Sequence, residues 1–137
     1  MKSLKIGDLH ISVPIIQGGM GIGVSLSRLA SAVANMGGVG VISTVGIGLV
    51  GDHPGKNYRK SNIEAIREEI RKARKLSFGA LGVNIMTVLS YFSDMVKTSI
   101  EEGIDVIFSG AGLPLDLPKY LGEGIKTKLA PIVSSAR

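Results

Sequence analysis

The 137-residue sequence predicts an α/β fold built on parallel strands, from three observations. Five short runs are apolar throughout, as expected of parallel strands covered on both faces. Longer segments with helical periodicity separate these runs. The runs begin 25 residues apart, except for one interval of 40 that contains a polar, Gly-rich loop. The expected strands are residues 14–17, 39–43, 79–84, 104–109 and 129–133.

Helices are expected at 25–36, 61–75 and 88–102, with a shorter one within 115–121. Gly37 and Gly103 follow the first and third helices, where a left-handed residue commonly ends a helix. Ser61 and Glu64 have the spacing of a capping box at the start of the second. The stripes expected to face the core are Leu26, Leu29, Ala30 and Val33 in the first helix, Ile63, Ile66, Ile70 and Ala73 in the second, and Leu89, Phe92, Val96 and Ile100 in the third.

A near-constant βα repeat predicts either a (β/α) barrel or an open doubly wound sheet. Eight units of this length need ~200 residues or more, and this chain contains five strands. Either the sheet is open and complete, or residues 1–137 are the first part of one larger barrel domain. A barrel fragment would have two unpaired sheet edges.

Composition narrows the classes of function. The chain has no Cys and two widely separated His, which excludes a disulfide scaffold and a thiol nucleophile and argues against a metal site built from histidines. The net charge is +5, and residues 56–75 alone carry it, with eight basic and three acidic side chains. Tyr58 is the only aromatic residue there, so a solvated helix face is favoured over nucleic-acid binding.

The chain reads as cytoplasmic, with no membrane partner. The N-terminus lacks the apolar core of a signal peptide. The uncharged stretch 29–51 is long enough to cross a bilayer, but its six glycines and Asn35 fit a helix end, a turn and a buried strand better.

Ligands of such folds bind at the C-terminal ends of the strands. Directly after the first expected strand, residues 17–23 begin with Gln17 and contain Gly18, Gly19, Gly21 and Gly23. Glycines allow the backbone to approach a ligand closely and offer it N–H groups. The segment does not complete a G-x-G-x-x-G fingerprint, and a tight turn is the alternative reading.

The residues at other strand ends are small or polar. Asn84 interrupts the apolar third strand, and its carboxamide suits a planar heteroaromatic ring that carries C=O and N–H groups; capping the next helix is the alternative. Ser109 and Gly110 begin a second Gly-rich turn after the fourth strand. Acid–base residues are missing from these ends; His10 has no assigned role, and His53 is read as solvated.

These segments together resemble the nitronate monooxygenase family, also called 2-nitropropane dioxygenase-like, and its related FMN-dependent enoyl-ACP reductases. The match covers nearly the whole chain in family order and does not separate the two activities. The matching segments are PIIQGGM at 14–20, GGVGVI at 37–42, 78–86 with its GVNIM ending, SGAGLP at 109–114 and PIVSS at 131–135.

The resemblance implies a (β/α)8 TIM barrel that binds FMN, of which this chain supplies about the first five strands. The implied cofactor-binding residues are Gln17, Gly18, Gly19, Met20, Asn84, Ser109 and Gly110. The family's catalytic His and phosphate-binding glycines lie after later strands, so no catalytic residue and no metal ligand are expected in this chain.

The implied activity is oxidation of alkyl nitronates with O₂, and the alternative is enoyl-ACP reduction with NAD(P)H. The expected partners are a small-molecule substrate and the remaining barrel segment or a second fragment, with a homo-oligomer left open and no nucleic acid. A non-catalytic ligand-binding or assembly module is the alternative of another class.

Overall fold

The computed structural model describes residues 2–50 and 57–135, so His53 lies outside the described residues. A hairpin of β1 (Leu4–Ile6) and β2 (Leu9–Ile11) comes first. The helices are α1 (Ser27–Asn35), α2 (Tyr58–Leu76) and α3 (Phe92–Glu101), with short 3-10 turns η1 (Ile47–Leu49) and η2 (Leu117–Tyr120). The remaining strands are β3 (Gly40–Ser43), β4 (Leu81–Met86), β5 (Val106–Gly110) and β6 (Lys128–Pro131).

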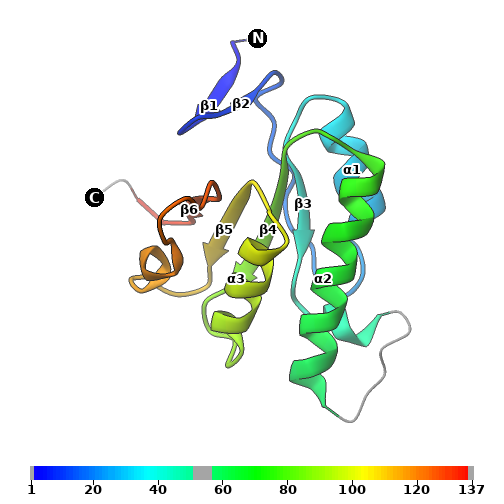
Figure 1. Cartoon of the computed structure of the whole chain (residues 1–137), viewed down its shortest axis with the longest axis vertical. Helices are drawn as coiled ribbons and strands as arrows, with labels where there is room; N and C mark the ends of the chain where they lie inside the picture. The colour runs from blue at the N-terminus through cyan, green and yellow to red at the C-terminus, as the bar shows by residue number, and fades with distance from the viewer. Residues whose placement is uncertain (1, 51–56, 136–137) are drawn as a thin grey trace.

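Strands β3, β4, β5 and β6 form one parallel sheet in that spatial order, which confirms the predicted α/β class (Figure 1). The expected first strand is reduced to a single parallel bridge between Ile16 and Val39. The bridge is made by Val39 N–H to Ile15 C=O at 2.9 Å and Gln17 N–H to Val39 C=O at 3.0 Å. The chain thus enters the sheet beside β3.

The sheet has two differently covered faces. On the helix-side face, Ile42, Val83 and Ile107 are fully buried in one core with Ile70 of α2 and Met95 of α3. The other face is here called the inner face. On it, alternate residues of β3 and β5 form a second core together with residues of β2 and of the segment before β3. Its buried members are Ile11, Val39, Val41 and Val106.

The β1–β2 hairpin was not anticipated, and it covers the inner face. Ile11 is buried against the second core, and the hairpin lies near the N-terminal ends of the strands (Figure 1). A period-2 alternation is visible in the sequence on either side of Gly7 and Asp8, and Gly7 adopts a φ of +62° in the turn. This end of the inner face is therefore covered by the hairpin, which is not part of the predicted βα repeat.

The helix predictions are confirmed in position and corrected in detail. Gly37 and Gly103 follow α1 and α3 with φ values of +88° and +70°. The predicted capping box is wrong, because α2 begins at Tyr58 and its N-cap is Asn57, whose side chain accepts the Lys60 N–H at 3.0 Å. In α1, Leu29 is 44% exposed, whereas Ala30 is fully buried.

The basic helix α2 is neutralised by residues that follow it in the chain. Glu102 at the end of α3 binds both Arg67 and Arg71, the latter at 2.7 Å from Arg71 Nε to Glu102 Oε2. Arg74 binds Asp105 at 2.8 Å. These pairs join groups about 31–35 positions apart, so the local charge of 56–75 did not reveal them. The helix is thus a packed, ion-paired layer of the fold.

Replacing Glu102 with Gln is expected to lower the unfolding free energy by about 1 kcal/mol at pH 7. The substitution removes charge-assisted hydrogen bonds with two arginines, and solvent screening of these arginines keeps the effect small. Hydrogen bonding from Arg71 holds the pKa of Glu102 below its ordinary value of 4.5, so its contribution is present above that value and is lost as the pH falls below it. Urea titrations at pH 7 and pH 3 measure this difference.

Glu123 supplies the control, because it is exposed and has no ion pair in the described part of the chain. Glu123→Gln is expected to leave stability unchanged at both pH values. An equal loss of stability in Glu102→Gln at pH 7 and pH 3 would contradict the ion-pair explanation.

Both edges of the sheet are unpaired within the described residues. Beside the 13–17 edge, an apolar groove of about 310 Å³ is lined by Val13, Ile15, Ala32, Val33, Met36 and Gly38. Ile15 is 52% exposed and Met36 is 78% exposed. Beyond β6, Ile132 and Val133 are also exposed. None of the helices described combines the length and apolar character needed to span a bilayer.

Candidate functional site

The Gly-rich loop 17–25 contacts the C-terminal ends of β3 and β4. The loop is joined to the turn after β3, since Ile22 N–H donates to Val45 C=O at 2.8 Å. It is also joined to β3 itself, since Ser43 N–H donates to Ser25 C=O at 2.9 Å. The predicted residues of the first and third strand ends are therefore brought together in space.

The central contact of this site is between Gly19 and Asn84. A Cβ placed on Gly19 would lie 2.6 Å from Asn84 Cβ and 2.8 Å from its Nδ2, so only glycine lets the loop backbone lie this close. Leu81, Val83 and Ile85 belong to the helix-side core, and so Asn84 points to the inner face. The structure thus brings the glycine loop and Asn84 into contact.

The Asn84 side chain is free to bind a ligand. Its backbone C=O accepts both the N–H and the hydroxyl of Thr44, each at 3.1 Å. Its carboxamide is half-buried and makes no hydrogen bond to any residue that the structure describes. The carboxamide therefore keeps its hydrogen-bond donor and acceptor available to a polar ligand on the inner face.

The Gln17 side chain is directed toward β3 and Ser25. Its Oε1 accepts the Val41 N–H at 3.2 Å, and its Nε2 donates to the Val41 C=O at 3.0 Å and to Ser25 Oγ at 3.1 Å. All of its amide hydrogens are therefore committed inside the protein. The prediction that Gln17 binds a cofactor is not supported by the direction of its side chain.

Ser109 is also directed away from the inner face. It shares the helix-side direction of Ile107, is fully buried, and lies 3.2 Å from Thr87 Oγ1. Thr87 also binds the Gly110 C=O through its N–H at 2.8 Å and its hydroxyl at 3.0 Å. Of the two residues predicted at this strand end, only Gly110 lies on the inner side of the sheet.

Apolar side chains surround the loop on its solvent side. Met20, Ile22 and Val24 are 64%, 69% and 57% exposed. Ile22 has a φ of +50°, a strained value for a β-branched residue. A Cβ on Gly23 would lie 3.0 Å from the Val50 methyl groups, so the loop packs tightly on the turn after β3. Met20, predicted on motif position, has its side chain available at the rim.

Sequence reasoning overlooked Ser25 and gave little weight to Ser43. Ser25 lies within a residue pattern read only as helical, yet it is buried and accepts hydrogen bonds from the loop. Ser43 is buried at the end of β3, in register with Asn84, and its hydroxyl has no hydrogen-bond partner in the described residues. A hydroxyl in an otherwise apolar strand was the available signal for Ser43.

None of the titratable groups that the structure describes is part of this arrangement. The described residues contain no group of three or more His, Asp or Glu side chains placed to hold a metal ion. The group with a strongly displaced pKa is Tyr91, which burial and the Tyr58 hydroxyl 3.4 Å away raise above its ordinary range. Tyr91 belongs to the helix-side core. The site can therefore position a ligand and hydrogen-bond to it, but its own side chains supply no proton transfer.

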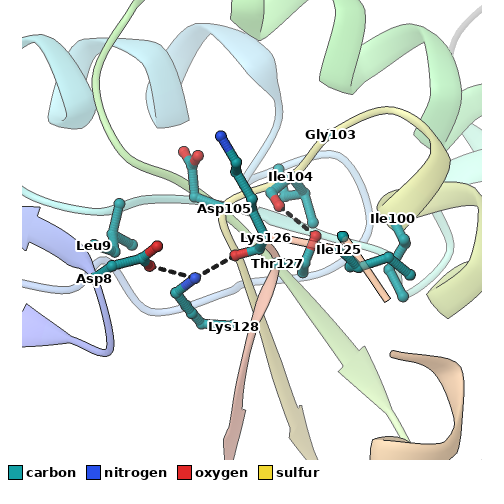
Figure 2. A pocket seen from close by; sticks show the side chains of 11 residues that line it. Asp8, Leu9, Ile100, Gly103, Ile104, Asp105, Ile125, Lys126, Thr127 and Lys128 are labelled. Atoms are coloured by element: carbon teal, nitrogen blue, oxygen red, sulfur yellow. Dashed lines mark hydrogen bonds and ion pairs between the residues drawn. The ribbon is translucent and has the colours of Figure 1, made fainter. Parts of the chain in front are cut away.

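A second hollow, of about 540 Å³, lies at the opposite, N-terminal end of the sheet (Figure 2). Two of its charged groups pair there: Lys128 Nζ binds Asp8 and also the Lys126 C=O, and the hydrogen bond from Lys128 lowers the pKa of Asp8. Thr127 Oγ1 donates to the Ile104 C=O at 2.8 Å. This hollow is thus held together internally and lies away from the strand ends where ligands of such folds bind.

Comparison with known proteins gives one family. The family model described as nitronate monooxygenase matches residues 2–110. The structure of FabK from Thermotoga maritima is similar, with a TM-score of 0.69 and 33% identity over 91% of this chain. A methionine-to-alanine mutant of that FabK gives a TM-score of 0.72 and 32% identity. The chain spans only 35–37% of the length of these proteins. No match was found among curated proteins.

Proposed function

Because this chain belongs to the nitronate monooxygenase family, we propose that it forms the first part of a TIM-barrel oxidoreductase and contributes to its FMN site. The family is flavin-dependent in general. The observation that carries the proposal is the Gly19 backbone lying against the unpartnered, inward-facing carboxamide of Asn84. A backbone that allows close approach, next to an amide that can donate and accept hydrogen bonds, suits the binding of a flat ring with polar edges.

Each residue of the site has a distinct part in this proposal. Asn84 would hydrogen-bond to the flavin or its ribityl chain, and the Gly18 and Gly19 backbone would lie against it. The Gly110 backbone would line the site at the end of β5, where a Cβ would lie 3.2 Å from the Ile132 side chain. The exposed Met20 side chain would exclude water from the rim. When bound, FMN supplies the hydride and electron transfer that no side chain here can provide.

The proposed reaction is oxidation of alkyl nitronates with O₂. Enoyl-ACP reduction with NAD(P)H is the second candidate, favoured by the similarity to FabK, an enoyl-ACP reductase of the same family. In both cases we place the catalytic His after later strands of the barrel, as the family resemblance implies. His10 lies in the hairpin, whose strand β2 covers the end of the sheet away from the site.

The remaining barrel segment is the proposed partner. The two unpaired edges, beside residues 13–17 and at β6, are those at which a parallel barrel would continue. The groove beside Ile15 and Met36 is lined almost entirely by apolar atoms, as expected where a further helix would cover the sheet. The small share of FabK that this chain spans agrees with a contribution from additional strands.

FMN titration of the chain tests the cofactor proposal, read by quenching of flavin fluorescence. We expect saturable binding, and we expect Asn84→Leu, which keeps the side-chain volume and removes the amide, to weaken it about tenfold. This factor corresponds to the loss of one or two hydrogen bonds to the ligand.

Asn35→Ala is the matched control, since the Asn35 amide binds the Leu76 C=O at 3.1 Å at the end of α1, away from the site. It should bind FMN as the unsubstituted chain does. Absence of any FMN binding by the unsubstituted chain would reject the cofactor proposal and favour a non-catalytic binding or assembly module. Equal affinities of Asn84→Leu and Asn35→Ala would reject the role of Asn84.

A further inference from the structure

The segment 13–17, which lies beside β3, ends its pairing with the sheet in an unusual way. Main-chain pairing with β3 stops after Gln17 N–H binds Val39 C=O. The Gln17 carboxamide then takes the next position, binding both the N–H and the C=O of Val41 as a neighbouring peptide group would. The polar groups at the edge of β3 are therefore satisfied without the main chain of residues 18 and 19. This main chain is free to leave the edge and reach Asn84 on β4.

Ser25 holds the departing loop at a second point. It is 1% exposed, and its hydroxyl accepts hydrogen bonds from the Met20 N–H at 3.0 Å and from Gln17 Nε2 at 3.1 Å. The same hydroxyl donates to the Gly18 C=O at 3.3 Å. In addition, Ser25 N–H donates to the Met20 C=O at 3.0 Å. One serine thus closes residues 18–24 into a loop and connects it to Gln17.

These contacts determine which backbone groups remain for a ligand. The Met20 N–H is committed to Ser25. The N–H groups of Gly18 and Gly19 have no partner in the described part of the chain. A flexible glycine pair would lose much conformational entropy on binding a ligand, whereas a pair ordered in advance loses less.

We propose that Gln17 and Ser25 are positioning residues, which order the Gly18–Gly19 backbone beside Asn84 before the ligand binds. The proposal rests on the proposed function for the identity of the ligand, FMN. It assigns neither residue a contact with the flavin. This positioning role accounts for a glutamine directly before the glycine pair, although its side chain does not reach the inner face.

Ser25→Ala tests the proposal with two readouts on the whole chain. Amide hydrogen exchange, followed by NMR without FMN, should become at least tenfold faster at Met20, whose N–H loses its acceptor. The dissociation constant for FMN, from fluorescence quenching, should rise about five- to tenfold, because the loop must be ordered on binding. Gln17→Met, which keeps the chain length and removes the amide, should change both readouts in the same direction.

Ser99→Ala is the control for removal of a buried hydroxyl. Ser99 is fully buried, and its hydroxyl donates to the Met95 C=O at 2.7 Å within α3, away from the loop. It should lower the melting temperature without altering Met20 exchange or FMN affinity. The proposal is overturned if Ser25→Ala and Gln17→Met match Ser99→Ala in both readouts. Faster Met20 exchange in a chain that never binds FMN would support the ordering and reject the proposed cofactor instead.

Discussion

Replacing Gly40 with alanine is expected to prevent the chain from folding. Gly40 begins β3, and a Cβ there would lie 1.8 Å from the Ala30 C=O oxygen and 2.5 Å from its carbonyl carbon. These are backbone atoms of α1, so no side-chain rotation can relieve the clash. Moving α1 would disrupt the core around Ala30 and Ile42, at a cost of more than ~4 kcal/mol against a typical total of 5–15 kcal/mol.

Soluble expression and urea unfolding measure this effect. The expected result is an insoluble chain, or one without a cooperative transition. Gly122→Ala is the matched control, because a Cβ there meets only Ile125 Cδ1 at 3.8 Å, and it should unfold like the unsubstituted chain. A cooperative Gly40→Ala protein within about 1 kcal/mol of that control would show that α1 does not lie on β3 as described.

Replacing Gly19 with alanine is expected to abolish measurable FMN binding while leaving the fold intact. The added Cβ would lie 2.6 Å from Asn84 Cβ and 3.0 Å from its Cγ, forcing the loop and the amide apart. This separates the two groups on which the proposed site depends. Because the loop lies at the surface of the sheet, most of the loss should appear in binding, with a decrease of at least 30-fold in affinity, or about 2 kcal/mol.

Gly18→Ala controls for loss of backbone freedom in the same loop, since a Cβ on Gly18 meets nothing within 4 Å. Fluorescence titration and thermal unfolding of both variants separate binding from stability. We expect Gly18→Ala to lose clearly less FMN affinity than Gly19→Ala, because its Cβ displaces no protein atom and leaves Asn84 in place. Similar affinities for the two variants would mean that the contact between Gly19 and Asn84 does not shape the site.

Local patterns were sufficient for most of the helices and parallel strands. Continuous apolar runs located β3, β4, β5 and β6 to within a few residues, because strands buried on both faces need apolar side chains throughout. Left-handed glycines after α1 and α3 ended those helices where predicted. The hairpin was overlooked, although its alternation around Gly7 is visible, because each of its strands has only three residues.

The candidate site could be predicted only in part. Motif position placed Gly19 and Asn84 at the ends of the first and third expected strands, and the structure brings them into contact across the end of β3. Motif position could not predict the directions of the Gln17 and Ser109 side chains. Each lies at a strand end, where a shift of one residue moves a side chain from one face of the sheet to the other. It also could not reveal that Ser25, eight residues from Gln17, holds the loop through its hydroxyl.

By itself, the sequence determined that the fold is a parallel α/β repeat, that the polar and glycine residues lie at the strand ends, and that the chain resembles one flavin-dependent family. Periodicity and residue type are properties of neighbouring positions, and they suffice for these conclusions. Only the tertiary structure decided that the charge of α2 is paired with α3, that Gln17 completes the edge of β3, and that Asn84 keeps a free amide. Each of these depends on contacts between residues distant in the chain, whose partners are chosen by packing.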